Sequence, residues 1–157
     1  MLFRSQLADG QNQLNVDLKF SLDGVNYIKR FSFTRGLYDL KVTYLIDNES
    51  NKPWSGNLFA QLKRDGSSDP SSSTATGTAT YLGAALWTSN EPYKKVSMKD
   101  IDKGALKETV QGGWVAWLQH YFVTAWIPNK GEANLVQTRK DSQGNYIIGF
   151  TDRKSVV

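Results

Sequence analysis

The sequence contains no cysteine and a single histidine, His120, among its 157 residues. These absences exclude disulfide bonds, thiolate zinc sites, a cysteine nucleophile and any metal site built from several histidines. The sequence also lacks a Gly-x-Ser-x-Gly elbow, a phosphate-binding loop and the glycine motif of dinucleotide-binding proteins. We therefore expect no enzymatic activity and no cofactor or metal.

The sequence also has a small net charge and no long hydrophobic run. Lys and Arg number 19 against 15 Asp and Glu, a formal charge of +4, which is far from that of a nucleic-acid-binding arm. The lysines between residues 93 and 107 alternate with acids, so we interpret this stretch as a solvated face. No run approaches the ~20 apolar residues of a membrane-spanning helix. We expect no secretory signal at the N-terminus and no membrane span in the sequence as given.

Aromatic residues are abundant, at 12% of the chain, and residues that alternate between apolar and polar predict strands with one buried face. The pair Asp23-Gly24 is typical of a tight hairpin turn. Ser, Thr and Gly dominate residues 65–80, which predicts an exposed, mobile loop. The predicted strands include 14–20, 25–33, 38–46, 58–62, 134–140 and 146–150. About seven or eight strands with few helices indicate an all-β, antiparallel sandwich.

The densest aromatic segment runs from residue 112 to residue 128. Its first half has apolar residues at helical spacing, and its second half alternates up to Pro128. We predict a short helical turn near 114–121 that leads into a buried strand, and we interpret the whole segment as interior packing between two sheets. The paired glycines at its start would permit a conformation or a close approach that a side chain would block. The helical face would consist of Trp114, Trp117, Leu118 and Tyr121.

Two kinds of site remain open at this point. His120 could be a catalytic base, but no motif identifies a serine that would act as its nucleophile. We therefore favour a hydrogen-bonded structural histidine. The acids lie mostly in turns, which gives little support to a glycosidase or sugar epimerase. Five tryptophans could stack on sugars, and Trp54 and Trp87, which border loops, are the better platforms for a carbohydrate-binding module. Trp114 and Trp117 are expected in the core.

Residues 112–128 read Gly-Gly-Trp-Val-Ala-Trp-Leu-Gln-His-Tyr-Phe-Val-Thr-Ala-Trp-Ile-Pro, and this stretch resembles the signature of the large periplasmic domain of YidC-type membrane protein insertases. Supporting motifs follow the family's order: Phe-Thr-Arg-Gly-Leu-Tyr at 33–38, Gln-Leu-Lys at 61–63, Tyr-Leu-Gly-Ala-Ala at 81–85 and Tyr-Lys-Lys at 93–95. The residues that the resemblance marks as a structural signature are Gly112, Gly113, Trp114, Leu118, Gln119, Tyr121, Phe122, Ala125, Trp126 and Pro128.

The resemblance implies a fragment, residues 7–151, of a periplasmic β-super-sandwich, with flanks 1–6 and 152–157 that match nothing in the family. It further implies that the full protein belongs to the bacterial inner membrane. There it would insert and help to fold nascent membrane proteins, alone or with components of the Sec translocon, without a nucleotide or metal. This segment would lie in the periplasm and have a structural or partner-binding role. The alternative is a carbohydrate-binding β-sandwich module.

Overall fold

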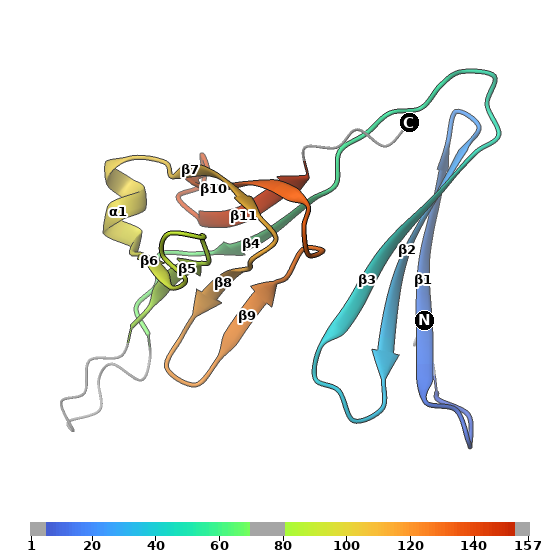
Figure 1. Cartoon of the computed structure of the whole chain (residues 1–157), viewed down its shortest axis with the longest axis horizontal. Coiled ribbons are helices and arrows are strands. Elements are labelled where there is room, and N and C mark those ends of the chain that lie inside the picture. The colour runs from blue at the N-terminus through green and yellow to red at the C-terminus, as the bar shows by residue number, and fades with distance from the viewer. Residues whose placement is uncertain (1–5, 70–80, 153–157) are drawn as a thin grey trace. The chain divides into compact units, whose positions relative to one another are not determined.

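The computed structural model describes residues 6–69 and 81–152, which form two compact units divided between Trp54 and Ser55. Figure 1 traces the elements of each unit in chain order. Most of the loop predicted at 65–80 lies outside the described residues, as do nearly all residues of the two flanks.

The first unit is one antiparallel sheet of order β1-β2-β3, made of β1 (Gln13–Leu22), β2 (Val25–Thr34) and β3 (Leu40–Asn48). The β1–β2 turn contains Asp23 at φ 52° and Gly24 at φ 78°. Two successive positive φ values match the right-handed twist of a hairpin, which is why the Asp-Gly pair is found there. The predicted hairpin and the strand that follows it are confirmed.

The register of this sheet gathers most of its apolar side chains on one face. Val16 lies opposite Phe31, which lies opposite Val42, and Phe20 lies opposite Tyr27, which lies opposite Ile46. The other face is mostly polar, apart from Ile28 and Leu45. It contains the bidentate pair of Arg30 and Asp17, with N···O distances of 2.7 and 2.8 Å. Within the described part of this unit no second layer covers the apolar face, and Leu18 and Phe20 are 57% and 60% exposed.

Trp54 contacts the same apolar face. Its indole Nε1 donates to the Tyr27 hydroxyl at 2.8 Å, and the two rings meet edge to face. The side chain is half-buried. Trp54 is therefore tied to its own sheet by the Tyr27 contact and is not the freely exposed platform that the sequence predicted.

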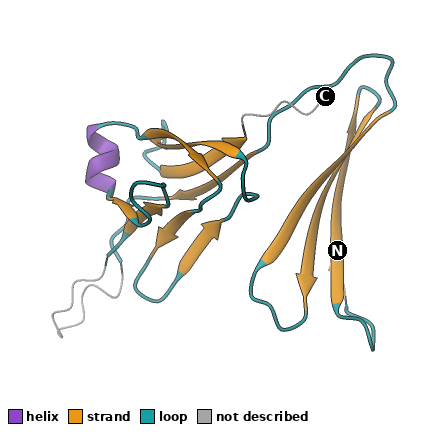
Figure 2. Cartoon of the chain, viewed as in Figure 1, coloured by secondary structure: helices purple, strands orange, loops and turns teal. Residues whose placement is uncertain are grey.

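The second unit is a sandwich of two four-stranded antiparallel sheets (Figure 2). One sheet has the order β4-β11-β10-β7, and its strands are β4 (Phe59–Arg64), β7 (Lys107–Gln111), β10 (Ala133–Lys140) and β11 (Tyr146–Asp152). The other has the order β6-β5-β8-β9, and its strands are β5 (Gly83–Leu86), β6 (Lys94–Val96), β8 (Val115–Leu118) and β9 (Val123–Trp126). The predicted all-β sandwich is confirmed.

The core of this unit lies between the two sheets. One sheet contributes Leu86 and Trp117, and the other contributes Val136, Ile148 and Phe150. Leu86 and Ile148 are completely buried, with 0% exposure. Strands β5–β9 are three to five residues long. The strand predicted in the second half of residues 112–128 is present as β9. β5 and β8 are buried along nearly their whole length, and a strand buried on both faces shows no alternation that would predict it.

The only helix among the described residues is α1 (Met98–Lys103), and it lies in the lysine-rich stretch. Ser97 caps it: the Ser97 hydroxyl accepts from the Asp100 N–H, and the Asp100 carboxylate accepts from the Ser97 N–H, which is a capping box. The helical turn predicted near 114–121 is wrong. Residues 115–118 are extended because they pair with β5 on one side and β9 on the other, and tertiary pairing overrides a helical spacing of apolar residues.

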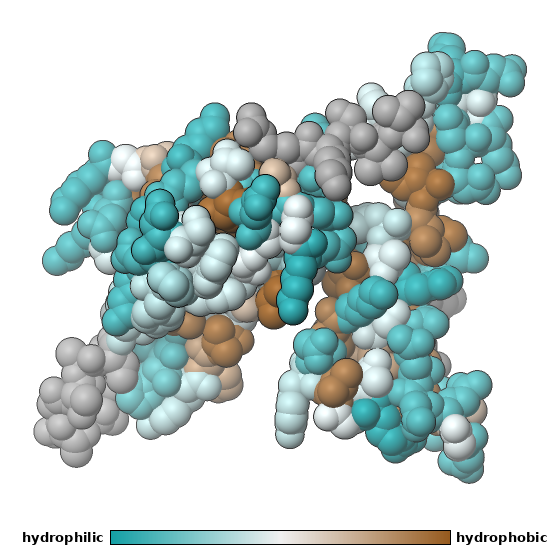
Figure 3. Space-filling view, viewed as in Figure 1, coloured by the Kyte–Doolittle hydropathy of each residue, from teal (hydrophilic) through white to brown (hydrophobic). Residues whose placement is uncertain are grey.

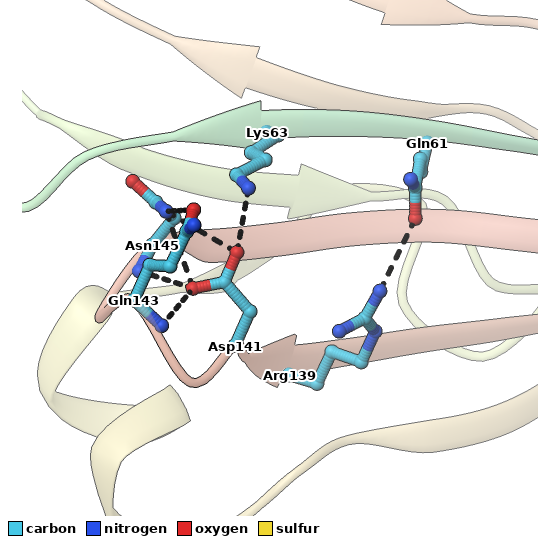
Figure 4. A network of polar contacts seen from close by, with 6 residues as sticks. All are labelled: Gln61, Lys63, Arg139, Asp141, Gln143 and Asn145. Carbon is cyan, nitrogen blue, oxygen red and sulfur yellow. Dashed lines mark hydrogen bonds and ion pairs between the residues drawn. The ribbon is translucent and has the colours of Figure 1, made fainter.

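The turn between β10 and β11 depends on one carboxylate, Asp141 (Figure 4). Asp141 Oδ1 accepts from the backbone N–H groups of Gln143 and Asn145, each at 2.9 Å, and Oδ2 pairs with Lys63 Nζ at 2.7 Å. These donors favour the ionised form, so the pKa of Asp141 lies well below its usual range, chiefly because of the Lys63 hydrogen bond.

We expect the turn to lose its stabilising effect in acid. A carboxyl whose pKa is depressed in the folded chain stabilises it above the unfolded pKa of about 3.9 and loses that contribution as pH falls below this value. Urea unfolding of the wild type and Asp141→Asn at several pH values checks this. The stability difference between them should be largest near neutral pH and shrink in acid, and a difference that does not change with pH contradicts the assignment.

Candidate functional site: the β8–β9 hairpin

Two glycines, Gly112 and Gly113, lie just before the β8–β9 hairpin. Gly112 and Gly113 have φ values of 64° and 80°, a backbone region that residues other than glycine rarely adopt. A Cβ on Gly113 would lie 2.8 Å from Cε3 of the Trp87 ring. Trp87 is therefore half-buried against backbone and is not an open platform. The predicted role of the glycines is confirmed on both counts, conformation and close approach.

The inner side of the hairpin belongs to the core. Trp117 is 6% exposed, and Trp126 packs against the same cluster while its Nε1 donates to the Gln61 carbonyl at 3.3 Å. Trp114 is half-buried, outside the core cluster, with its ring centroid 6.0 Å from that of Tyr93. The core prediction is thus confirmed for Trp117 and wrong for Trp114.

The tip and outer edge of the hairpin are exposed. Tyr121, Phe122 and Val123 are 78%, 72% and 65% exposed, and Ile127 is 72% exposed. Hydrophobic atoms are visible at this hairpin in Figure 3. The interpretation of the whole segment as interior packing is therefore wrong for these residues, because the chain reverses between Gln119 and Phe122, each of whose N–H groups donates to the carbonyl of the other.

His120 lies in this reversal and is held through its backbone. Its N–H donates to Asp69 Oδ2 at 3.2 Å, and its ring meets the Tyr121 ring edge to face. The imidazole Nδ1 is buried, and no described residue hydrogen-bonds it. The ring is thus not the hydrogen-bonded group that the sequence suggested. Asp69, expected in an exposed loop, is 7% exposed.

The remaining polar clusters join elements of the fold. Lys140 Nζ donates to Asp102 Oδ1 at 2.8 Å, and the Tyr146 hydroxyl donates to Asp102 Oδ2 at 2.9 Å, so α1 is tied to β10 and β11. The Asp102 hydrogen bond raises the pKa of Lys140 to about 12. Within residues 6–69 and 81–152, no three His, Asp or Glu side chains are placed to hold a metal ion.

A shallow depression of about 390 Å³ marks the outer face of the β4-β11-β10-β7 sheet. Gly149 forms part of its lining, together with Gln61, Gln137 and Arg139. The Arg139 guanidinium donates to Gln61 Oε1 at 3.5 Å (Figure 4). This hydrogen bond links β10 to β4 across β11.

The exposed edge of β9 was not predicted, although the sequence contains a signal for it. Between Glu108 and Glu132 the only charged residue is Lys130. A long uncharged, aromatic stretch reads equally well as core or as a contact surface. The ten signature residues accordingly divide: Gly112 is buried, Gly113, Trp114, Leu118, Gln119, Trp126 and Pro128 are half-buried, and Tyr121, Phe122 and Ala125 are exposed.

Fold and site together define an all-β sandwich domain that presents an uncharged aromatic hairpin. The chain matches the model of the YidC periplasmic domain over residues 3–157, and it belongs to that family. It is 97% identical over 146 residues to the membrane protein insertase YidC of Pseudomonas fluorescens strain SBW25. It is 82% identical over the same length to the insertases of Pseudomonas syringae pv. syringae and Pseudomonas putida strain F1.

The matches cover 93% of this chain but 26% of each relative, so the chain spans about a quarter of the length of these insertases. No helix in the described part of the chain is long and apolar enough to cross a membrane. Nothing in these comparisons supports a carbohydrate-binding module.

Proposed function

We propose that the chain acts as a periplasmic segment of an inner-membrane insertase and has a structural or partner-binding role, without enzymatic activity or a cofactor. The full protein inserts and helps to fold nascent membrane proteins, alone or with components of the Sec translocon. The observation that carries this proposal is the 97% identity over 146 residues to a stretch of a named insertase. The satisfied polar clusters and the exposed hairpin are compatible with a contact role.

A segment exchange in the Pseudomonas fluorescens insertase tests this role. Replacing the matched stretch by this chain should leave the insertion of a defined inner-membrane protein unchanged, as followed by protease protection. Replacing it by an unrelated periplasmic β-sandwich should reduce either insertion or co-purification with Sec components. If the unrelated sandwich supports both fully, the proposed role is wrong.

Because the chain contains no cysteine, a cysteine introduced at one position reports on which side of the membrane that position lies. Ser142→Cys, in an exposed turn, should react with a membrane-impermeant maleimide added from the periplasmic side, whereas Ile148→Cys, at 0% exposure, should react only after unfolding. Labelling of Ser142→Cys only from the cytoplasmic side would contradict a periplasmic location.

A further inference from the structure

The edges of the sheets differ in one respect that bears on binding. An edge strand carries unpaired N–H and C=O groups and can pair with another chain, and proteins usually prevent this with charged residues. Among the described strands, six form edges: β1, β3, β4, β6, β7 and β9. Each of the first five contains at least two charged residues, such as Lys94 and Lys95 in β6, whereas β9 (Val-Thr-Ala-Trp) contains none.

The backbone groups that β9 leaves free can be assigned from the hairpin register. Gln119 and Phe122 exchange both N–H···O bonds, so they form a hydrogen-bonded pair, and such pairs alternate with non-bonded pairs along an antiparallel ladder. Leu118 and Val123 are then a non-bonded pair, as are Ala116 and Ala125. The N–H and C=O groups of Val123 and Ala125 therefore point away from β8, toward the free edge.

The side chains along this edge are apolar as well as exposed. Val123 is 65% exposed, and Phe122 and Ile127, which flank the strand, are each 72% exposed. Asp, Glu, Lys and Arg are absent from residues 112–129. A neutral, apolar edge with free backbone groups favours an extended polypeptide of the same character, because backbone hydrogen bonds give affinity and apolar side chains add to it.

We propose that β9 is a β-augmentation site, at which an extended, uncharged and largely apolar segment of a client polypeptide adds as a further strand beside Val123 and Ala125. This inference rests on the proposed function, since the clients of an insertase are rich in such segments. A second copy of the chain is a poorer occupant. A stable dimer buries roughly 1,000 Å² or more, which a strand of four residues does not provide, whereas transient contact with a client requires no such area.

Peptide binding to the 157-residue chain tests the proposal directly. The probe is a capped peptide of alternating valine and threonine with a lysine at each end, and its control is the same peptide N-methylated at alternate residues. We expect saturable binding by fluorescence anisotropy for the first peptide and none for the second. In amide exchange, Val123 and Ala125 should exchange quickly in the free chain and slowly with peptide, while Thr124 and Trp126 should be protected in both states.

Two variants change the edge, and one matched control does not. Ala125→Pro removes an outward N–H while leaving the β8 ladder intact, and Val123→Lys gives β9 the charge that the other edges have. Each should weaken peptide binding by about tenfold or more, the loss of roughly 1.4 kcal/mol. Thr109→Lys, on the exposed side of the already charged edge β7, should bind as the wild type does. Far-UV circular dichroism confirms that all three variants are folded.

Several results would overturn the proposal. They are the absence of peptide binding, binding that survives both β9 variants, and a concentration-dependent dimer that Val123→Lys abolishes, since the last assigns the edge to a second copy. None of these results changes the outcome expected from the segment exchange described above. The failure of the β9 site and the failure of the insertase role are therefore separate outcomes.

Discussion

Trp117→Ala should lower the free energy of unfolding by about 3–5 kcal/mol, the range for large aromatic deletions in a core. The side chain is 6% exposed and lies in the cluster that joins the two sheets of the second unit. Its removal leaves a cavity in the cluster to which both sheets contribute, and a close-packed interior fills such a cavity only in part.

Urea unfolding followed by far-UV circular dichroism measures this loss without using tryptophan emission. Tyr121→Ala removes an aromatic ring from the same hairpin at a position that is 78% exposed, and it should change stability by no more than about 0.5 kcal/mol. Trp117→Phe should retain most of the wild-type stability, because the indole Nε1 is buried without a partner among the described residues and its deletion costs no hydrogen bond. Equal losses for Trp117→Ala and Tyr121→Ala would contradict the core assignment.

The parts of the fold that were predicted correctly are those in which the sequence alternates regularly or contains a distinct turn. β1, β2 and β3 alternate apolar and polar residues over most of their length, and the Asp23-Gly24 turn has a specific backbone requirement that the sequence displays. The β10–β11 hairpin is similar, since its turn is built from the polar residues 141–145. In these cases the residues of a segment are sufficient to predict its secondary structure.

The β8–β9 hairpin shows where local chemistry is insufficient. Trp114, Trp117, Leu118 and Tyr121 match a helical stripe, yet strand pairing on both sides of β8 makes the segment extended and separates them: Trp117 goes inward and Tyr121 outward. Whether an uncharged aromatic residue faces the core or the solvent depends on which strand lies next to it, and no pattern within the segment encodes that neighbour. The free edge of β9 became visible only from the sheet order.

Gly149→Ala should destabilise the chain by about 2–3 kcal/mol, although adding a methyl group to a strand glycine ordinarily stabilises it. Gly149 lies in β11, directly opposite Gln61 of β4. A Cβ at this position would approach the Ala60 carbonyl oxygen and would lie 2.9 Å from Gln61 Cβ and 3.0 Å from Gln61 Cα. Two of these three atoms are backbone, so β4 must shift as a strand and cannot yield by rotating a side chain.

The control for this prediction is Gly104→Ala, at the C-terminal end of α1. Gly104 has an extended φ of 170°, and no atom lies within 4 Å of the point that a Cβ would occupy, so the substitution should be neutral or stabilise by up to about 1 kcal/mol through the unfolded chain. The midpoints of thermal and urea unfolding of the two variants should therefore shift in opposite directions or by clearly unequal amounts. If Gly149→Ala is as stable as Gly104→Ala, the close approach of β4 to β11 is wrong.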